Sequence, residues 1–142
     1  MDIEEIYINL KVLESLNKNQ KLISRGQYIN VETNSIIPEF IRRWHRQDNR
    51  NETLNKINLI VNSAIEYIQN DQNPNKIKII TDNNNNNDAK NISPHEMKSY
   101  LKKSLHGISN LKETYATCSQ TCARIDVIIN KINHVLQGGF VA

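Results

Sequence analysis

The chain has 142 residues, of which 38% are hydrophobic, and its formal net charge at pH 7 is +3. This length suits one domain with a modest core, and so small a charge is low for a dedicated nucleic-acid binder. No apolar run approaches the roughly 18 residues of a membrane span, and the acidic start Met1–Glu5 is unlike a secretory signal. Two cysteines are too few for a disulfide framework. We therefore expect an intracellular protein without membrane association.

The first 70 residues predict a helical module. Apolar residues recur every three or four positions over 2–18 and again over 50–69, which predicts two amphipathic helices, the second roughly 30 Å long. Between them, Arg25-Gly26 is a turn signal and Tyr28–Val31 favours extended backbone, so we expect a minor β-hairpin or an extended loop near 20–33. Residues 38–47, with Pro38 near the first helical position, predict a short helix.

A change of composition then predicts a linker. Residues 71–92 contain Pro74, which a helix interior does not tolerate, and a run of five asparagines at 83–87 that has no apolar side chain to bury. The sequence thus divides into an N-terminal helical module (1–70), an asparagine-rich linker (71–92) and a C-terminal helix (93–139).

The C-terminal part has the most regular pattern. Ser93-Pro94-His95-Glu96 is a capping box with proline at the first helical position, and Gly138-Gly139 suits a helix end. The residues between them predict one helix of roughly 65 Å with a coiled-coil heptad pattern. The alternative is two helices hinged at His106-Gly107, because an interior glycine weakens a helix. We call the heptad residues the seam, namely Leu101, Ser104, Ile108, Leu111, Tyr115, Cys118, Cys122, Ile125, Ile129, Ile132 and Leu136.

The length of the seam predicts self-association. The helices expected at 2–18 and 50–69 are too short to cover it singly, and soluble monomers avoid a long exposed apolar stripe. We therefore expect an all-α helical bundle with a long C-terminal coiled-coil helix that forms a homo-oligomer. Every seam residue except the polar Ser104 is expected in the interface.

One basic cluster suggests an alternative function. Arg42, Arg43, Arg46 and Arg50 surround Trp44, the only tryptophan, on the short helix and the start of the next. Arginines can follow a phosphate backbone while an aromatic ring stacks on a base, so a nucleic-acid-binding module is the second interpretation. The opposing interpretation is a solvated helix face beside a buried tryptophan, with the arginines paired to nearby carboxylates.

The sequence predicts no catalytic site and no cofactor. Cys118 and Cys122 are spaced to share a helix face, but they would supply only half of a metal site, so we expect no metal. We expect both cysteines to pack as small apolar residues of the seam, because buried free cysteines are common in protein cores. The four histidines are scattered, and no glycine-rich phosphate loop is present.

Two groups of segments resemble known proteins. Residues 105–115 with 124–132, and residues 9–16, 21–25 and 42–44 with Arg50, are similar to small helical proteins of giant DNA viruses. The resemblance covers most of the chain outside the linker and implies a helical fold and a viral source, but no catalytic residue. It favours a structural or interaction protein of the host cytoplasm or the virion, with a further viral protein as a candidate partner.

Overall fold

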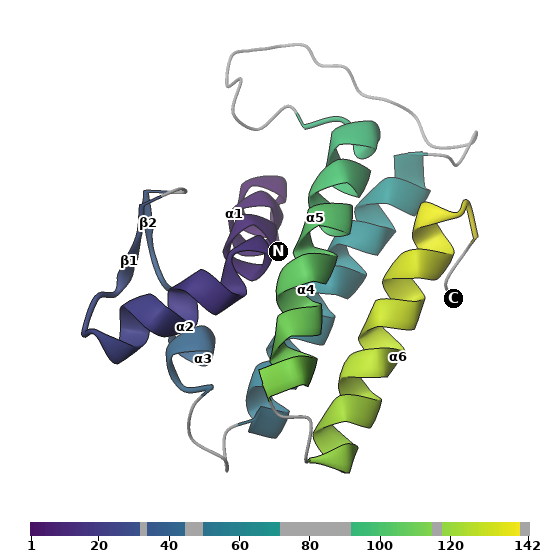
Figure 1. Cartoon of the computed structure of the whole chain (residues 1–142). Coiled ribbons are helices and arrows are strands. Elements are labelled where there is room, and N and C mark those ends of the chain that lie inside the picture. Colours follow the sequence, from purple (N-terminus) through teal and green to yellow (C-terminus); the bar gives the residue numbers. More distant parts are fainter. Residues whose placement is uncertain (32–33, 45–49, 72–91, 115–117, 140–142) are drawn as a thin grey trace.

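The computed structural model describes residues 1–31, 34–44, 50–71, 92–114 and 118–139. These residues form six helices and one two-stranded antiparallel hairpin, which confirms the all-α class with a minor hairpin. In Figure 1, α5 lies between α1 and the pair α4 and α6, and it runs opposite to α4 and α6. The elements are α1 (Ile3–Glu14), α2 (Leu16–Ser24), β1 (Ile29–Asn30), β2 (Ser35–Ile36), α3 (Glu39–Arg42), α4 (Arg50–Asp71), α5 (Pro94–Thr114) and α6 (Ser119–Leu136).

The N-terminal helix differs from the expected span of 2–18. A capping box of Asp2 and Glu5 begins α1, which ends at Glu14, and a separate helix, α2, follows Ser15. The Ser15 hydroxyl bonds the carbonyls of the preceding turn, a local alternative to continuing the helix. The strands lie at 29–30 and 35–36, so the hairpin extends beyond the predicted 20–33.

Helices α4 and α6 lie parallel and are joined by a repeated polar contact. Arg124 donates to the side-chain oxygens of Asn51 and Asn55, at 2.8 and 2.6 Å. One heptad further on, the Lys131 ammonium donates to Asn58 and Asn62, both at 2.8 Å. Each cation therefore spans two asparagines one turn apart, and the equal spacing on both helices keeps them in register.

The prediction of one long C-terminal helix is wrong. The chain ends α5 at Thr114 and begins α6 at Ser119, where Cys118 takes an extended conformation as the N-cap. Figure 1 shows α6 folded back along α5. The alternative hinge at His106-Gly107 is wrong as well, since α5 continues through both residues. The capping box at Ser93 and Glu96 and the helix end at Gly138 are confirmed.

Folding back buries the seam inside the chain. Ser104 and five of the ten predicted interface residues are buried, and the five are Leu101, Ile108, Leu111, Ile125 and Ile132. On α6 the buried residues are Thr121, Ile125, Ile128, Ile132 and Val135. Ile125 and Ile132 are therefore buried as predicted, whereas the other three each precede a predicted seam residue by one position. Ile129 and Leu136 pack at the edge of the core, Cys118 and Cys122 are half-buried, and Tyr115 lies outside the described residues.

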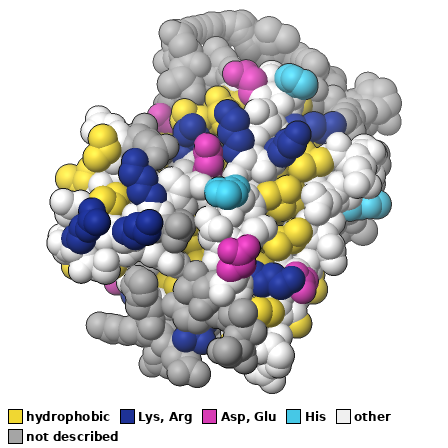
Figure 2. Space-filling model, in the orientation of Figure 1, with side chains coloured by type: hydrophobic (Ala, Val, Ile, Leu, Met, Phe, Trp, Pro, Cys, Tyr) yellow, Lys and Arg dark blue, Asp and Glu magenta, His cyan; other side chains and the backbone are white. Residues whose placement is uncertain are grey.

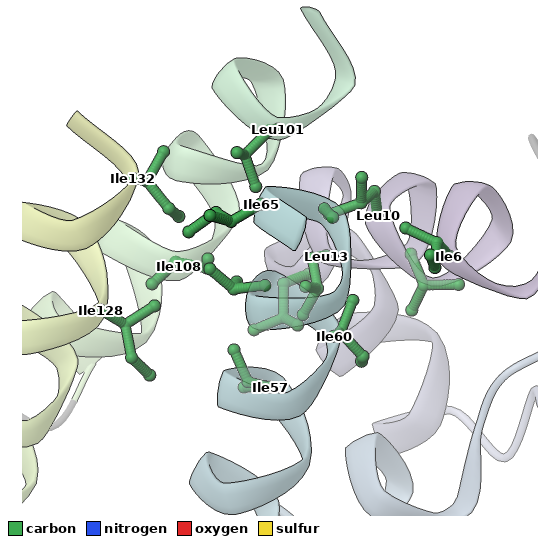
Figure 3. Packing of buried hydrophobic residues seen from close by; sticks show 14 of the residues in the cluster. Ile6, Leu10, Leu13, Ile57, Ile60, Ile65, Leu101, Ile108, Ile128 and Ile132 are labelled. Carbon is green, nitrogen blue, oxygen red and sulfur yellow. The ribbon is translucent and has the colours of Figure 1, made fainter. Parts of the chain in front are cut away.

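One hydrophobic core joins the two predicted helical parts. Figure 3 shows Leu10 and Leu13 of α1 with Ile60 of α4, Ile108 of α5 and Ile132 of α6 around the same interior. Most of the predicted linker, residues 72–91, lies outside the described residues. The helices at 1–70 and 93–139 therefore pack against each other across that segment.

Gly107 explains how closely α1 and α5 approach. A Cβ atom at this position would lie 1.6 Å from the Leu13 carbonyl oxygen, so only glycine lets the two backbones meet. Gly107 lowers the intrinsic helix propensity of α5, but the packing of α5 against α1 requires it.

We predict that Gly107→Ala lowers the free energy of unfolding by about 3 kcal/mol, because the added methyl group must push α1 and α5 apart. Urea denaturation measures the loss. Ser99→Ala, an exposed change on the same helix, is the matched control and should stay within about 0.5 kcal/mol of the wild type. Equal stabilities for the two variants would contradict the close approach.

Candidate interaction surface

The hairpin is held to the helices by a buried polar network. The Asn30 amide, 2% exposed, donates to Asn19 Oδ1 at 2.8 Å and to Ser15 Oγ at 3.0 Å. Asn19 is also buried, and its own amide donates to the Val12 carbonyl at 3.0 Å. Buried polar groups are costly unless they are paired, and here each amide finds partners at the junction of α1 and α2.

This network fixes which face of the hairpin is turned inward. Successive side chains of a strand point to opposite faces, so burying Asn30 directs Ile29 outward. Val31, which follows β1 at the start of the turn, is exposed as well. Ile36 lies directly across from Ile29 in the antiparallel register and therefore shares its face. The hairpin thus buries its polar side and exposes its apolar side, the reverse of the usual arrangement.

We call Ile29, Val31 and Ile36 the outer face of the hairpin. These side chains are 58%, 78% and 68% exposed, and Tyr28 beside them is also exposed. Figure 1 shows the hairpin projecting from the helices beside the end of α2, so the outer face is remote from the core. Single exposed apolar residues are ordinary, but three on one projecting element form a patch.

The structure buries the tryptophan that the nucleic-acid interpretation uses for stacking. Trp44 is 1% exposed and belongs to the core, so its ring does not stack on a base. Arg42 pairs with Glu39 at 2.8 Å and lies 5.2 Å from the ring centre of Tyr28. Arg43 pairs with Glu52 at 3.4 Å. The solvated-face interpretation therefore fits these residues better.

Of the remaining arginines of the cluster, Arg50 lies within the described residues and Arg46 does not. Arg50 begins α4 and is near Cys118 at the start of α6. A small cleft of about 240 Å³ lies beside the hairpin, lined by Ile23, Tyr28, Glu39, Arg42 and Arg43.

Cys118 has the more polar surroundings of the two thiols. Its sulfur lies 3.0 Å from the Thr121 hydroxyl. Hydrogen bonds from the hydroxyl and the backbone amide of Thr121 hold the pKa of the Cys118 thiol below its ordinary value, and the Arg50 guanidinium adds to this effect. The Cys122 sulfur lies 3.7 Å from the Lys112 carbonyl oxygen.

The described residues hold no group of three or more histidine, cysteine or acidic side chains that could share a metal ion. Among them, no helix combines the length and apolar character that crossing a membrane demands. No protein-family model, curated protein or solved structure gives a significant match to this chain. The proposals below therefore rest on this chain's own geometry.

The sequence analysis missed the outer face. The alternation Ile29-Asn30-Val31 was visible, but alternation alone does not tell which side is buried, and the apolar side is the usual choice. The deciding partners, Ser15 between α1 and α2 and Asn19 on α2, lie more than ten residues away in the sequence. Only the fold brings these three polar side chains together.

We predict that Asn30→Ala loosens the hairpin and lowers the free energy of unfolding by about 1–3 kcal/mol, because Asn19 and Ser15 lose a buried donor. The backbone amide of Ile37 donates to the Tyr28 carbonyl at the end of the hairpin opposite the turn. This amide should exchange faster with solvent in the variant. Asn133→Ala, at an exposed position of α6, is the matched control. Unchanged exchange at Ile37 would show that the network does not hold the hairpin.

We also predict a low titration midpoint for Cys118. In a Cys122→Ser background, its alkylation by iodoacetamide should become fast at a lower pH than that of an ordinary thiol, since the thiolate reacts. Thr121→Val removes the hydroxyl and should raise the midpoint, while Ser119→Ala should leave it unchanged. Identical pH profiles for all three proteins would contradict the role of Thr121.

Proposed function

We propose that this protein is a non-enzymatic interaction protein that self-associates through the outer face of its hairpin. The observation that carries the proposal is the inverted hairpin, with Asn30 buried and Ile29, Val31 and Ile36 exposed. Burying three aliphatic side chains against another chain would remove their apolar surface from water.

The distribution of exposed apolar groups supports this surface over others. Seven large hydrophobic residues of the described chain are exposed, and four of them lie within 28–36. The other three, Met1, Leu59 and Val127, come from three separate elements or ends. Among the described residues, the hairpin is two strands wide, so each strand has an edge that pairs with no other described strand and that another chain can approach.

The C-terminal seam does not support self-association in this structure. Helices α1, α4 and the folded-back α6 of the same chain cover the part of the seam that lies on α5. Five of the ten predicted interface residues, Leu101 among them, are buried in the core of a single chain. We therefore move the proposed contact from the seam to the hairpin.

The resemblance to giant-virus proteins suggests where such a protein would act. A small self-associating protein suits an accessory or virion role in a giant virus, inside the host cell. The nucleic-acid alternative has less support, because its tryptophan is buried and two of its arginines are paired with carboxylates.

We predict that the wild-type protein self-associates at tens to hundreds of micromolar. A contact made mainly by three aliphatic side chains is small, and small interfaces bind weakly. The variant Ile29→Asp with Ile36→Asp should remain a monomer, since it would bury two unpaired charges. Sedimentation equilibrium measures both. Val127→Asp is the matched control, because Val127 is 61% exposed on α6 and away from the hairpin. A monomeric wild type across this range would refute the proposal.

A further inference from the structure

A second surface of the chain is a cleft lined in part by acidic residues, whereas the hairpin is an apolar projection. A cleft of about 570 Å³ lies between the start of α1 and the C-terminal half of α4. Its lining combines apolar and acidic residues, and the lining residues are Met1, Asp2, Ile3, Glu4, Ile6, Ser63, Glu66, Tyr67 and Asn70. None of the lining side chains among the described residues is a lysine or an arginine.

The cleft offers a negative rim above an apolar floor. Asp2, Glu4 and Glu66 supply three carboxylates, and Glu66 is exposed on the surface of α4. Ile6 is buried and Ile3 is half-buried at the floor. Such a cleft suits a group that is apolar at its tip and cationic at its edge.

The hairpin and the end of α2 form a group of that kind. Lys21 and Arg25 are exposed on α2 and at its C-cap, one turn apart, and Arg25 precedes Ile29 by four residues. Figure 2 shows lysine and arginine side chains gathered beside hydrophobic ones on this side of the molecule, over α2 and the hairpin. The outer face therefore has cations next to it.

We propose that the hairpin of one copy docks in the acidic cleft of a second copy. This inference rests on the proposed function and names the surface that receives the hairpin. Ile29, Val31 and Ile36 occupy the apolar floor, while Lys21 and Arg25 face the carboxylates of Asp2, Glu4 and Glu66. Opposite charges at the rim steer the two surfaces together and select the orientation.

The contact joins two different surfaces, because no residue of the hairpin lines the cleft. Each copy can donate its hairpin to one neighbour and accept the hairpin of another, which gives a closed ring or an open chain. Two copies that exchange hairpins across a twofold axis form a closed dimer through the same contact.

The test uses one variant for each surface. The hairpin variant is Ile29→Asp with Ile36→Asp, and the cleft variant is Glu66→Arg, which places a cation opposite Lys21 and Arg25. Both change exposed positions, so circular dichroism and thermal unfolding should match the wild type. We expect the cleft variant alone to associate roughly tenfold more weakly than the wild type in sedimentation velocity.

Mixing the two variants gives the decisive result. The hairpin variant keeps an intact cleft and the cleft variant keeps an intact hairpin, so a heterodimer should be the main product of the mixture. Combining Arg25→Glu with Glu66→Arg in one chain should restore much of the association, since the charges are exchanged. Lys56→Glu with Glu66→Arg is the matched control and should not restore it, because Lys56 is exposed on α4 outside both surfaces.

The outcomes separate this inference from the proposed function. If the cleft variant associates as strongly as the wild type while the hairpin variant is monomeric, the hairpin is the contact but the cleft is not its receptor. A wild type that stays monomeric at hundreds of micromolar overturns both.

Discussion

The buried Asn30 amide decides which side of the hairpin faces water. It donates hydrogen bonds to Asn19 and Ser15 at the junction of α1 and α2, and an apolar side chain at position 30 would remove this donor from both of them. Because strand side chains alternate, burying Asn30 turns Ile29 outward. An apolar patch that would ordinarily close over the core is thereby presented to other molecules.

The folding back of the C-terminal part is the second constraint. A single helix over 94–137 would carry more apolar surface than α1 and α4 could cover, and the chain avoids this by breaking between Thr114 and Ser119. Gly107 then lets α5 approach the backbone of α1 at Leu13, and the cations of α6 bind the asparagines of α4. These contacts bury most of the seam. Among the described residues, the exposed large hydrophobic side chains are then concentrated on the hairpin.

Sequence patterns predicted the elements better than their arrangement. Capping chemistry is local, so Ser93 and Glu96 located the start of α5 correctly, and apolar periodicity located α4. The break after Thr114 escaped notice because apolar residues on both of its sides face the same core, and the three-and-four spacing continues almost unshifted across it. The hairpin's inversion was beyond sequence reasoning for a different reason, since it depends on polar partners that only the fold assembles.

Hydroxyl-radical footprinting, read by mass spectrometry over a range of protein concentrations, tests the central claim most directly. In dilute protein, Ile29 and Ile36 should be oxidised readily, because the outer face is open to solvent, while Leu101 should be protected in the core. At hundreds of micromolar, the oxidation of Ile29 and Ile36 should fall and that of the exposed Val127 should not. Protection of Ile29 and Ile36 in dilute protein, or oxidation that does not change with concentration, would contradict the account.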